Sequence, residues 1–236
     1  MVRRLAYTVS EREHWISAAG GLIGMLAVWW VSALLLDSQG AVLVATSMGS
    51  TAVMLFAAPH GPMSQPWPLI GGHLVSALTG VACVQWLGSE RIMTAPLAVG
   101  LSIAAMYSLR CLHPPGGATA LGAVLGGESV HALGYLYVLS PILLNSLVIL
   151  AVAVAFNYPF AWRRYPQCWH CRAQARAAPV KESMIPHSNL VYALSQIDTF
   201  VDVSEEDLQQ IYALAMGQQS ASEVAPAQAT PAESLR

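Results

Sequence analysis

Residues 15–157 form a segment in which charged side chains are almost absent. The chain has 11 basic and 13 acidic residues, and only five of them fall within this segment: Asp37, Glu90, Arg91, Arg110 and Glu128. A soluble domain carries about 25% charged residues, whereas this 236-residue chain carries 10% charged and 55% hydrophobic residues. The segment therefore predicts a polytopic membrane protein. The net charge of −2 gives no basic field for nucleic acid.

Five apolar runs are long enough to cross a bilayer, and a sixth is apolar but shorter. The long runs cover residues 15–36, 41–58, 69–87, 93–112 and 133–156, and the short run covers residues 114–127. Six crossings place both termini on the same side. Nine basic residues then lie close to the spans on that side, against one, Arg91, on the other. The positive-inside rule makes the side that holds both termini cytoplasmic.

Two internal similarities divide the six elements into two halves of three. Residues 49–53 (GSTAV) resemble residues 117–121 (GATAL), and residues 68–75 resemble residues 141–148. Three elements per half give the halves opposite orientations, as in many transporters; chance similarity between apolar stretches is the alternative. The predicted fold is an all-α polytopic membrane helical bundle, with about six spanning elements as two inverted three-helix repeats with broken short helices.

The stretch Leu112–Leu121 (LHPPGGATAL) carries the densest signal. Its two prolines and two glycines break the chain, and helix resumes at about Ala118. The first N–H groups of a helix attract anions. We expect residues 49–51 to form the matching helix start in the first half, so that two helix N-termini hold a small anion at mid-membrane. The alternative is that these small residues only allow close helix packing.

The predicted substrate-binding residues come from both halves. They are Ser47, Gly49, Ser50, Thr51, His73, His113, Gly116, Gly117 and Thr119. The two histidines are predicted to donate hydrogen bonds or a proton, with a purely packing role as the alternative. Arg110 is predicted to attract anions to the inner mouth, or to act only as a positive-inside anchor. Valine at Gly117 is expected to abolish flux.

The other chemistry-bearing residues give weaker signals. Cys168 and Cys171 have CxxC spacing beside His170, but no second ligand pair follows, so we predict no metal and no cofactor and leave the role of the two cysteines open. The spans contain no carboxylate to complete a nucleophile, base and acid set, and no hydrolase motif occurs. An enzyme is therefore not expected.

The composition divides the chain into four parts. They are an N-terminal cytoplasmic segment (1–14), a transmembrane domain (15–157), a cytoplasmic basic segment with short amphipathic helices (158–216) and a disordered tail (217–236). The short helices, expected at 189–197 and 208–216, support an alternative function. The protein would then be a membrane scaffold or sensor that recruits a partner through them.

The stretch Leu112–Leu121 resembles the signature of the HPP family of integral membrane proteins, named for its His-Pro-Pro motif. Residues 48–59, 65–66, 71–78 and 165–166 are also similar to family segments, in the same order. Some plant and cyanobacterial relatives are associated with nitrite transport, so the resemblance implies a nitrite permease. We therefore expect a bacterial inner-membrane protein that passes a small monovalent anion, with nitrite as the best candidate. Whether it forms a homo-oligomer stays open.

Overall fold

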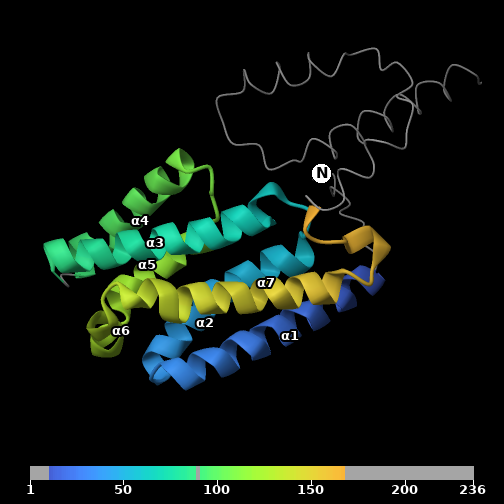
Figure 1. Ribbon diagram of the computed structural model, residues 1–236, viewed down its shortest axis with the longest axis horizontal. Coiled ribbons are helices and arrows are strands. Elements are labelled where there is room, and N and C mark those ends of the chain that lie inside the picture. Colours follow the sequence, from blue (N-terminus) through green and yellow to red (C-terminus); the bar gives the residue numbers. More distant parts are fainter. Residues whose placement is uncertain (1–10, 89–90, 168–236) are drawn as a thin grey trace, which may run out of the picture. The chain divides into compact units, whose positions relative to one another are not determined.

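The computed structural model describes residues 11–88 and 91–167. The helices in order are α1 (Glu11–Leu35), α2 (Ser38–Ala57), α3 (Pro66–Leu87), α4 (Arg91–Ser108), α5 (Pro115–Leu125), α6 (Gly127–Leu133) and α7 (Leu144–Asn157) (Figure 1). A π-helical turn (Val138–Leu143) leads into α7, and short 3-10 turns cover Pro62–Ser64 and Ala161–Arg163. The short helices predicted beyond residue 188, the predicted tail, Cys168 and Cys171 lie outside the described residues.

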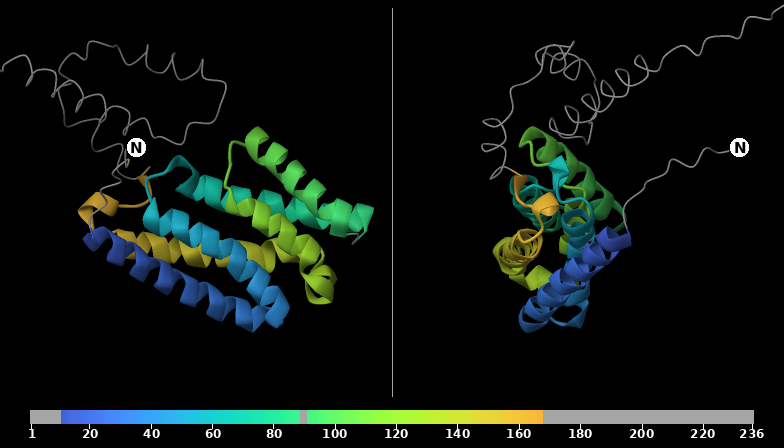
Figure 2. Two further views of the ribbon diagram at one scale, coloured as in Figure 1. Left: turned by 180° about the vertical axis from the view of Figure 1, so that it is seen from behind. Right: turned by 90° about the vertical axis from the view of Figure 1, so that its right-hand side faces the viewer.

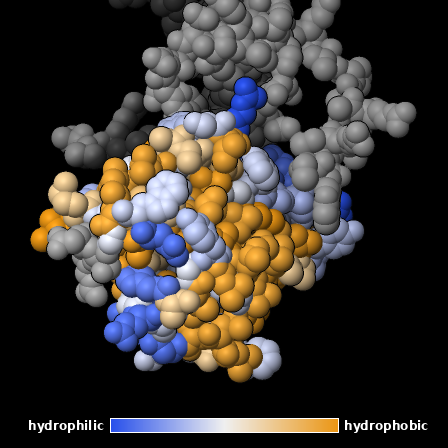
Figure 3. All heavy atoms as spheres, turned by 60° about the vertical axis from the view of Figure 1, so that its left-hand side comes forward, coloured by the Kyte–Doolittle hydropathy of each residue, from blue (hydrophilic) through white to orange (hydrophobic). Residues whose placement is uncertain are grey.

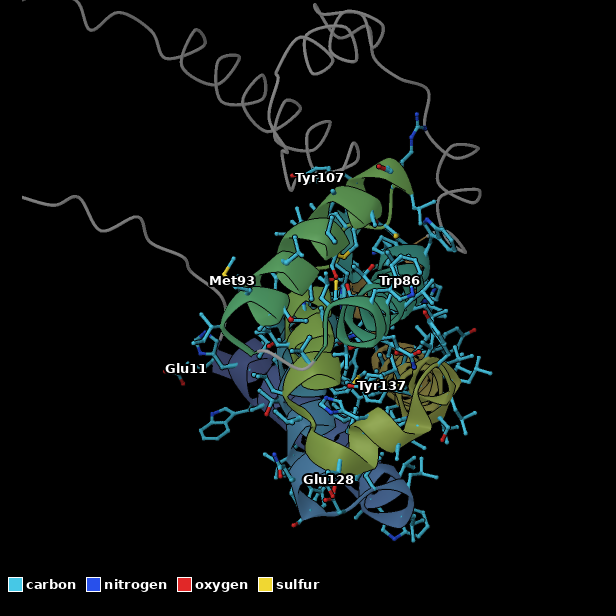
Figure 4. The ribbon with its side chains drawn as sticks, turned by 90° about the vertical axis from the view of Figure 1, so that its left-hand side faces the viewer. Glu11, Trp86, Met93, Tyr107, Glu128 and Tyr137 are labelled. Carbon is cyan, nitrogen blue, oxygen red and sulfur yellow. The ribbon has the colours of Figure 1, made fainter. Side chains whose placement is uncertain are left out.

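The helices are those of an integral membrane protein, as predicted. Four of them, Glu11–Leu35, Ser38–Ala57, Pro66–Leu87 and Val138–Asn157, are long and apolar enough to cross a bilayer. The shorter apolar helices Ile92–Ser108 and Pro115–Leu125 match the fourth and fifth predicted elements. Hydrophobic residues cover much of the face seen in Figure 3, and Met93 projects away from the bundle in Figure 4. Such a surface is stable in contact with lipid.

Corresponding helices of the two predicted halves make corresponding contacts. The first half is α1 to α3, and the second half is α4, α5 and α7. α1 packs on α2 of its own half and on α7 of the other half, and α4 packs on α5 and α3 in the same way. α1 and α4 lie on opposite sides of the bundle in both figures of the ribbon (Figures 1 and 2). This exchange of partners is what two repeats related by a two-fold axis require.

The predicted break in the second element is wrong, and the sixth element is broken instead. α2 runs without interruption through Gly49, Ser50 and Thr51. A backbone in lipid must satisfy its polar groups internally, and a single glycine does not prevent this. The predicted helix over 133–157 is interrupted, because Ser140 has a non-helical backbone (φ −136°, ψ 114°) just before Pro141. Proline disfavours the helical conformation in the residue that precedes it.

α3 and α5 approach one another closely through small residues. A Cβ atom added to Gly72 would lie 2.5 Å from the Cβ of His113, and one added to Gly80 would lie 2.8 Å from the carbonyl oxygen of Ala120. One added to Gly116 would lie 2.5 Å from the Ser76 hydroxyl. These distances leave no room for a larger residue. Glycine therefore lets the two backbones meet, as in many membrane helix pairs.

Asp37 marks one end of the bundle, which we call the Asp37 end. Its carboxylate accepts hydrogen bonds from the Gly40 N–H at the start of α2 (2.9 Å) and from the Ser129 hydroxyl on α6 (2.8 Å). The loop after α1 and the start of α6, where Glu128 lies (Figure 4), therefore share this end. The contact with Ser129 places Asp37 and the neighbouring Glu128 at one end of the bundle.

Arg163 organises the opposite end, which we call the Glu13 end. It is only 1% exposed. Its guanidinium pairs with Glu13 of α1 and donates to the carbonyl of Phe56 near the end of α2. Tyr165 is also buried, and its hydroxyl donates to the Ser64 carbonyl (2.7 Å). The last carbonyls of a helix lack partners within it and attract a cation, which explains the burial of this arginine.

Candidate functional site

Two histidines and two threonines form one buried cluster, which we call the His–Thr cluster. Thr51 lies on α2, His73 on α3, Thr119 on α5, and His113 in the break between α4 and α5. The Thr51 Oγ1 atom lies 2.8 Å from His73 Nε2 and 3.1 Å from His113 Nε2. His73 Nδ1 lies 2.7 Å from Thr119 Oγ1. All four side chains are at most 1% exposed.

The cluster joins matching positions of the two halves. Thr51 and Thr119 are equivalent residues in the similarity between residues 49–53 and 117–121. The two nitrogens of the His73 ring bridge the two threonine hydroxyls. The His113 ring packs edge-on against the His73 ring, with a centroid distance of 4.9 Å. The cluster therefore lies where the halves meet, which is where inverted-repeat transporters bind their substrates.

The break before α5 brings His113 into the cluster. α4 ends at Ser108, and Arg110 then has a left-handed backbone (φ 52°), which turns the chain back toward α3. The Cys111 N–H donates to the Met106 carbonyl (2.9 Å). The Nδ1 atom of His113 donates to the Met63 carbonyl (2.9 Å) in the turn between α2 and α3. The break is thus held by the loop at the Glu13 end.

The cluster lies closer to the Glu13 end than to the Asp37 end. Thr51 is six residues before the last residue of α2, and His73 is seven residues after the first residue of α3. At a rise of about 1.5 Å per residue, these positions are about 9 to 10 Å from the Glu13 end of the helices. A hydrocarbon core about 30 Å thick would place the cluster about a third of the way across.

Four of the nine predicted binding residues, Thr51, His73, His113 and Thr119, meet in this cluster, and the others do not. Ser50 is exposed on the outer surface of α2, and Gly49 lines a groove of about 330 Å³ between α1 and α2. The Ser47 hydroxyl is buried but donates to the Val44 carbonyl of its own helix. Gly117 faces α4, where a Cβ would have Val99 as its nearest neighbour at 3.8 Å. Gly116 packs against α3.

The predicted pair of helix N-termini is also wrong. Gly49 and its neighbours lie inside α2, where backbone N–H groups bond within the helix. At the start of α5, the Gly116 N–H donates to the His113 carbonyl (2.8 Å) and the Gly117 N–H donates to the Pro114 carbonyl (3.1 Å). These N–H groups are therefore not free to bind an anion. The hydrogen-bonding groups at the site are side chains.

Arg110 lies near the cluster, just after the end of α4. It is exposed after α4, three residues before His113, and the neighbouring Leu109 carbonyl accepts from the indole N–H of Trp67 at the start of α3. This places Arg110 at the Glu13 end, beside the loop that covers the cluster.

Other polar side chains are buried outside the cluster. Asn145 and Ser146 donate to the Pro141 and Ile142 carbonyls of their own segment. Among the described residues, the Asn145 Oδ1 and Ser32 Oγ atoms are buried without a hydrogen-bond partner. Buried polar atoms are usually bonded, so these two atoms are exceptions. Asn157 does bond between helices, to the Leu55 carbonyl (3.2 Å).

The described part of the chain contains no group of three or more His, Cys, Asp or Glu side chains that could hold a metal ion. The cluster has two imidazoles and two hydroxyls. Its chemistry is therefore hydrogen bonding and proton transfer.

Comparison with known proteins identifies relatives of the transmembrane part. A family model described as "HPP, transmembrane region" matches residues 6–166. Two curated transmembrane proteins of Dictyostelium discoideum are 37% and 33% identical over 159 residues, which cover 66% of this chain. The match covers 54% and 50% of those proteins, so the chain spans about half the length of the curated relatives it matches. No solved structure matches the chain.

Proposed function

This chain belongs to the HPP family of transmembrane proteins, and we propose that it transports a small monovalent anion, with nitrite as the best candidate. Its apolar helices are consistent with a transporter or channel. The observation that carries the proposal is the His–Thr cluster, in which two imidazoles and two hydroxyls from four parts of the chain meet in the buried interior. Ionisable groups inside a membrane are expensive and usually serve function.

The cluster offers hydrogen-bond donors and contains no competing negative charge. A small inorganic anion has only acceptor atoms, so it needs the N–H and O–H groups that imidazole and hydroxyl side chains supply. Among the described residues of α2, α3, α5 and the break before α5, there is no Asp or Glu. The side chains that can donate to an anion come from several elements, with no carboxylate among them. In the closed cluster they bond to one another, so an anion would replace those bonds.

The burial of the cluster suggests a carrier more than an open pore. All four side chains are closed off from solvent, so an anion reaches them only when the surrounding helices or the 58–65 loop move. The loop lies at the Glu13 end, beside Arg110. We propose that anions enter or leave there, that this end is cytoplasmic, and that the protein transports its ligand without catalysing a reaction.

Uptake of nitrite into proteoliposomes tests this function. The reconstituted protein should take up nitrite faster than protein-free vesicles, and Thr51→Val should abolish most of the excess. Thr46→Val is the matched control, because Thr46 lies on the same helix and bonds to its own Val42 carbonyl, yet is exposed and outside the cluster. Uptake by the folded protein equal to that of empty vesicles would contradict transport and favour the scaffold hypothesis.

A second pair of variants tests the histidines. His73→Ala should lose nitrite uptake, whereas His14→Ala, at an exposed position on α1, should not. Gel filtration in detergent establishes that each variant is folded before reconstitution. Equal uptake in His73→Ala and His14→Ala would show that the cluster is not the transport site.

A further inference from the structure

The hydrogen bonds of the His–Thr cluster form a chain with a single direction. The Met63 carbonyl can only accept, so Nδ1 of His113 carries a hydrogen, and Nε2 of the neutral ring is an acceptor. Thr51 must then donate its one hydrogen to His113 Nε2 (3.1 Å), so His73 Nε2 donates to Thr51 (2.8 Å). His73 Nδ1 is left to accept from Thr119 (2.7 Å). The chain therefore runs from Thr119 to the loop at the Glu13 end.

Each threonine also has a second acceptor, which allows the chain to hold one extra proton. The Thr51 hydroxyl lies 3.3 Å from the Ser47 carbonyl, and the Thr119 hydroxyl lies 3.5 Å from the Pro115 carbonyl. If His113 Nε2 takes the proton, Thr51 turns its hydrogen to Ser47 and accepts from both rings. No group then loses all its partners.

The extra proton can also reside on His73, at the Thr119 end of the chain. If His73 Nδ1 takes the proton, it donates to Thr119, which turns its hydrogen to Pro115. The two positions are linked through Thr51: His73 Nε2 passes a proton to the hydroxyl, and the hydroxyl passes its own hydrogen to His113 Nε2. This transfer leaves the number of protons in the cluster unchanged, and only N–H and O–H bonds form and break.

A proton held in the cluster would be an uncompensated positive charge. The elements that pack around it are α2, α3, α4, α5, α7, the break before α5 and the 58–65 loop. Their titratable groups are His60 of the loop, His73 and Cys83 of α3, Arg91 and Tyr107 of α4, and Arg110, Cys111 and His113 of the break; described residues of α2, α5 and α7 add none. None of these groups carries a negative charge at neutral pH. A buried charge without a partner is very unfavourable. The charged cluster therefore requires an anion beside it.

We propose that the Thr119–His73–Thr51–His113 chain takes up one proton with each monovalent anion, so that the protein is a proton–anion symporter. This inference rests on the proposed function and deepens it. Proton and anion stabilise one another in the cluster, and the pair crosses without net charge. Neither the proton without the anion nor the anion without the proton is stable there, which prevents leakage of either one.

Nitrite uptake with simultaneous measurement of luminal pH tests the coupling. Proteoliposomes with a trapped pH dye receive an inward nitrite gradient at pH 8, where little nitrous acid is present to cross the lipid, and protein-free vesicles give the background. The expected result is one proton per nitrite, with a rate that rises by up to about tenfold for each unit of external acidification. The rate should not respond to a potassium diffusion potential set with valinomycin.

Two variants of Thr51 test the chain itself. Thr51→Ser keeps the hydroxyl and should keep the ratio of one proton per nitrite, whereas Thr51→Ala removes the link and should lose coupled uptake. Nitrite uptake that leaves luminal pH unchanged and follows the membrane potential would overturn the coupling and leave anion transport intact. A wild-type proton ratio in Thr51→Ala would overturn the chain. Absence of nitrite uptake in the wild type would overturn the proposed function, and the coupling with it.

Discussion

Replacing Thr51 with valine perturbs the His–Thr cluster at its centre while preserving the shape of the side chain. The hydroxyl contacts His73 Nε2 at 2.8 Å and His113 Nε2 at 3.1 Å. Valine removes both hydrogen bonds and leaves two ring nitrogens buried without partners. The same change at Thr119 removes one contact to a ring, and at the exposed Thr46 it removes none.

The expected loss follows from the number of interhelical bonds. In membrane proteins such a bond contributes about 0.6 kcal/mol on average and about 1.7 kcal/mol at most. Thr51→Val should therefore lower the free energy of unfolding by about 1 to 3.5 kcal/mol, Thr119→Val by about half as much, and Thr46→Val by less than about 0.5 kcal/mol. The unpaired nitrogens move the Thr51 value toward the upper end of its range.

Unfolding by sodium dodecyl sulfate in mixed micelles, followed by circular dichroism, measures these differences. The double variant Thr51→Val/Thr119→Val should lose less than the sum of the two single losses, because both residues stabilise the same His73 ring. If Thr51→Val and Thr46→Val unfold at the same detergent fraction, the Thr51 hydroxyl does not stabilise the fold. If the losses in the double variant are strictly additive, Thr51 and Thr119 are not coupled through His73, although each can still bond to it individually.

Other residues give four further predictions. Gly72→Ala should destabilise the protein by about 1 to 3 kcal/mol, because its Cβ would lie 2.5 Å from the Cβ of His113. Gly117→Ala, whose Cβ would have its nearest neighbour at 3.8 Å, should be neutral or slightly stabilising in the same unfolding assay. An equal loss in both variants would contradict the close packing at Gly72. Arg163→Ala should cost about 1.5 to 3 kcal/mol, because it removes the charged donor that the buried Phe56 carbonyl and the Asn157 side-chain oxygen accept from. Thermal unfolding in detergent checks this, and a loss below about 0.5 kcal/mol would place the arginine in water. The hydrogen bond from Gly40, and to a smaller extent the one from Ser129, lowers the pKa of Asp37 below its usual 3.8. The stability that Asp37 contributes is therefore present at neutral pH and is lost as the pH falls through the lowered pKa. The difference in melting temperature between wild type and Asp37→Asn should disappear in strong acid, and a difference that is constant with pH would contradict this role. In cells, cysteines placed at Ser38 and Ser129 should react with an impermeant reagent from outside and a cysteine at Ser108 should not, whereas opposite reactivity of Ser38 and Ser129 would contradict their placement at one end.

The sequence pattern was sufficient for features that depend on local chemistry. The near absence of charge between residues 15 and 157 indicated a membrane protein because charged groups are costly in lipid. The prolines of Leu112–Leu121 indicated a break because they lack N–H donors, and the structure has that break between Ser108 and Pro115. The same rule applied to Pro141 would have predicted the interruption of the last element. The interruption was missed because Pro141 lies within a continuous apolar run that was long enough to be predicted as a single helix.

Local reasoning was insufficient where a residue's role depends on a distant partner. The similarity between residues 49–53 and 117–121 correctly marked Thr51 and Thr119 as a pair, but it suggested that both begin helices. Only Thr119 lies near a helix start, since no proline precedes Gly49 and α2 continues. A basic residue just after the last span, such as Arg163, is typical of an interfacial anchor. Its burial instead depends on Glu13, which is 150 positions away along the chain.

The amino-acid sequence by itself determined which segments enter the membrane, where the chain breaks before α5, and which polar residues are confined to the apolar region. The tertiary structure alone decided that Thr51, His73, His113 and Thr119 touch, across separations of 22 to 62 residues. The physical reason is helix packing. Gly72, Gly80 and Gly116 let α3 and α5 approach until the break contacts α3, and that close approach brings the two imidazole rings within reach of one hydroxyl group.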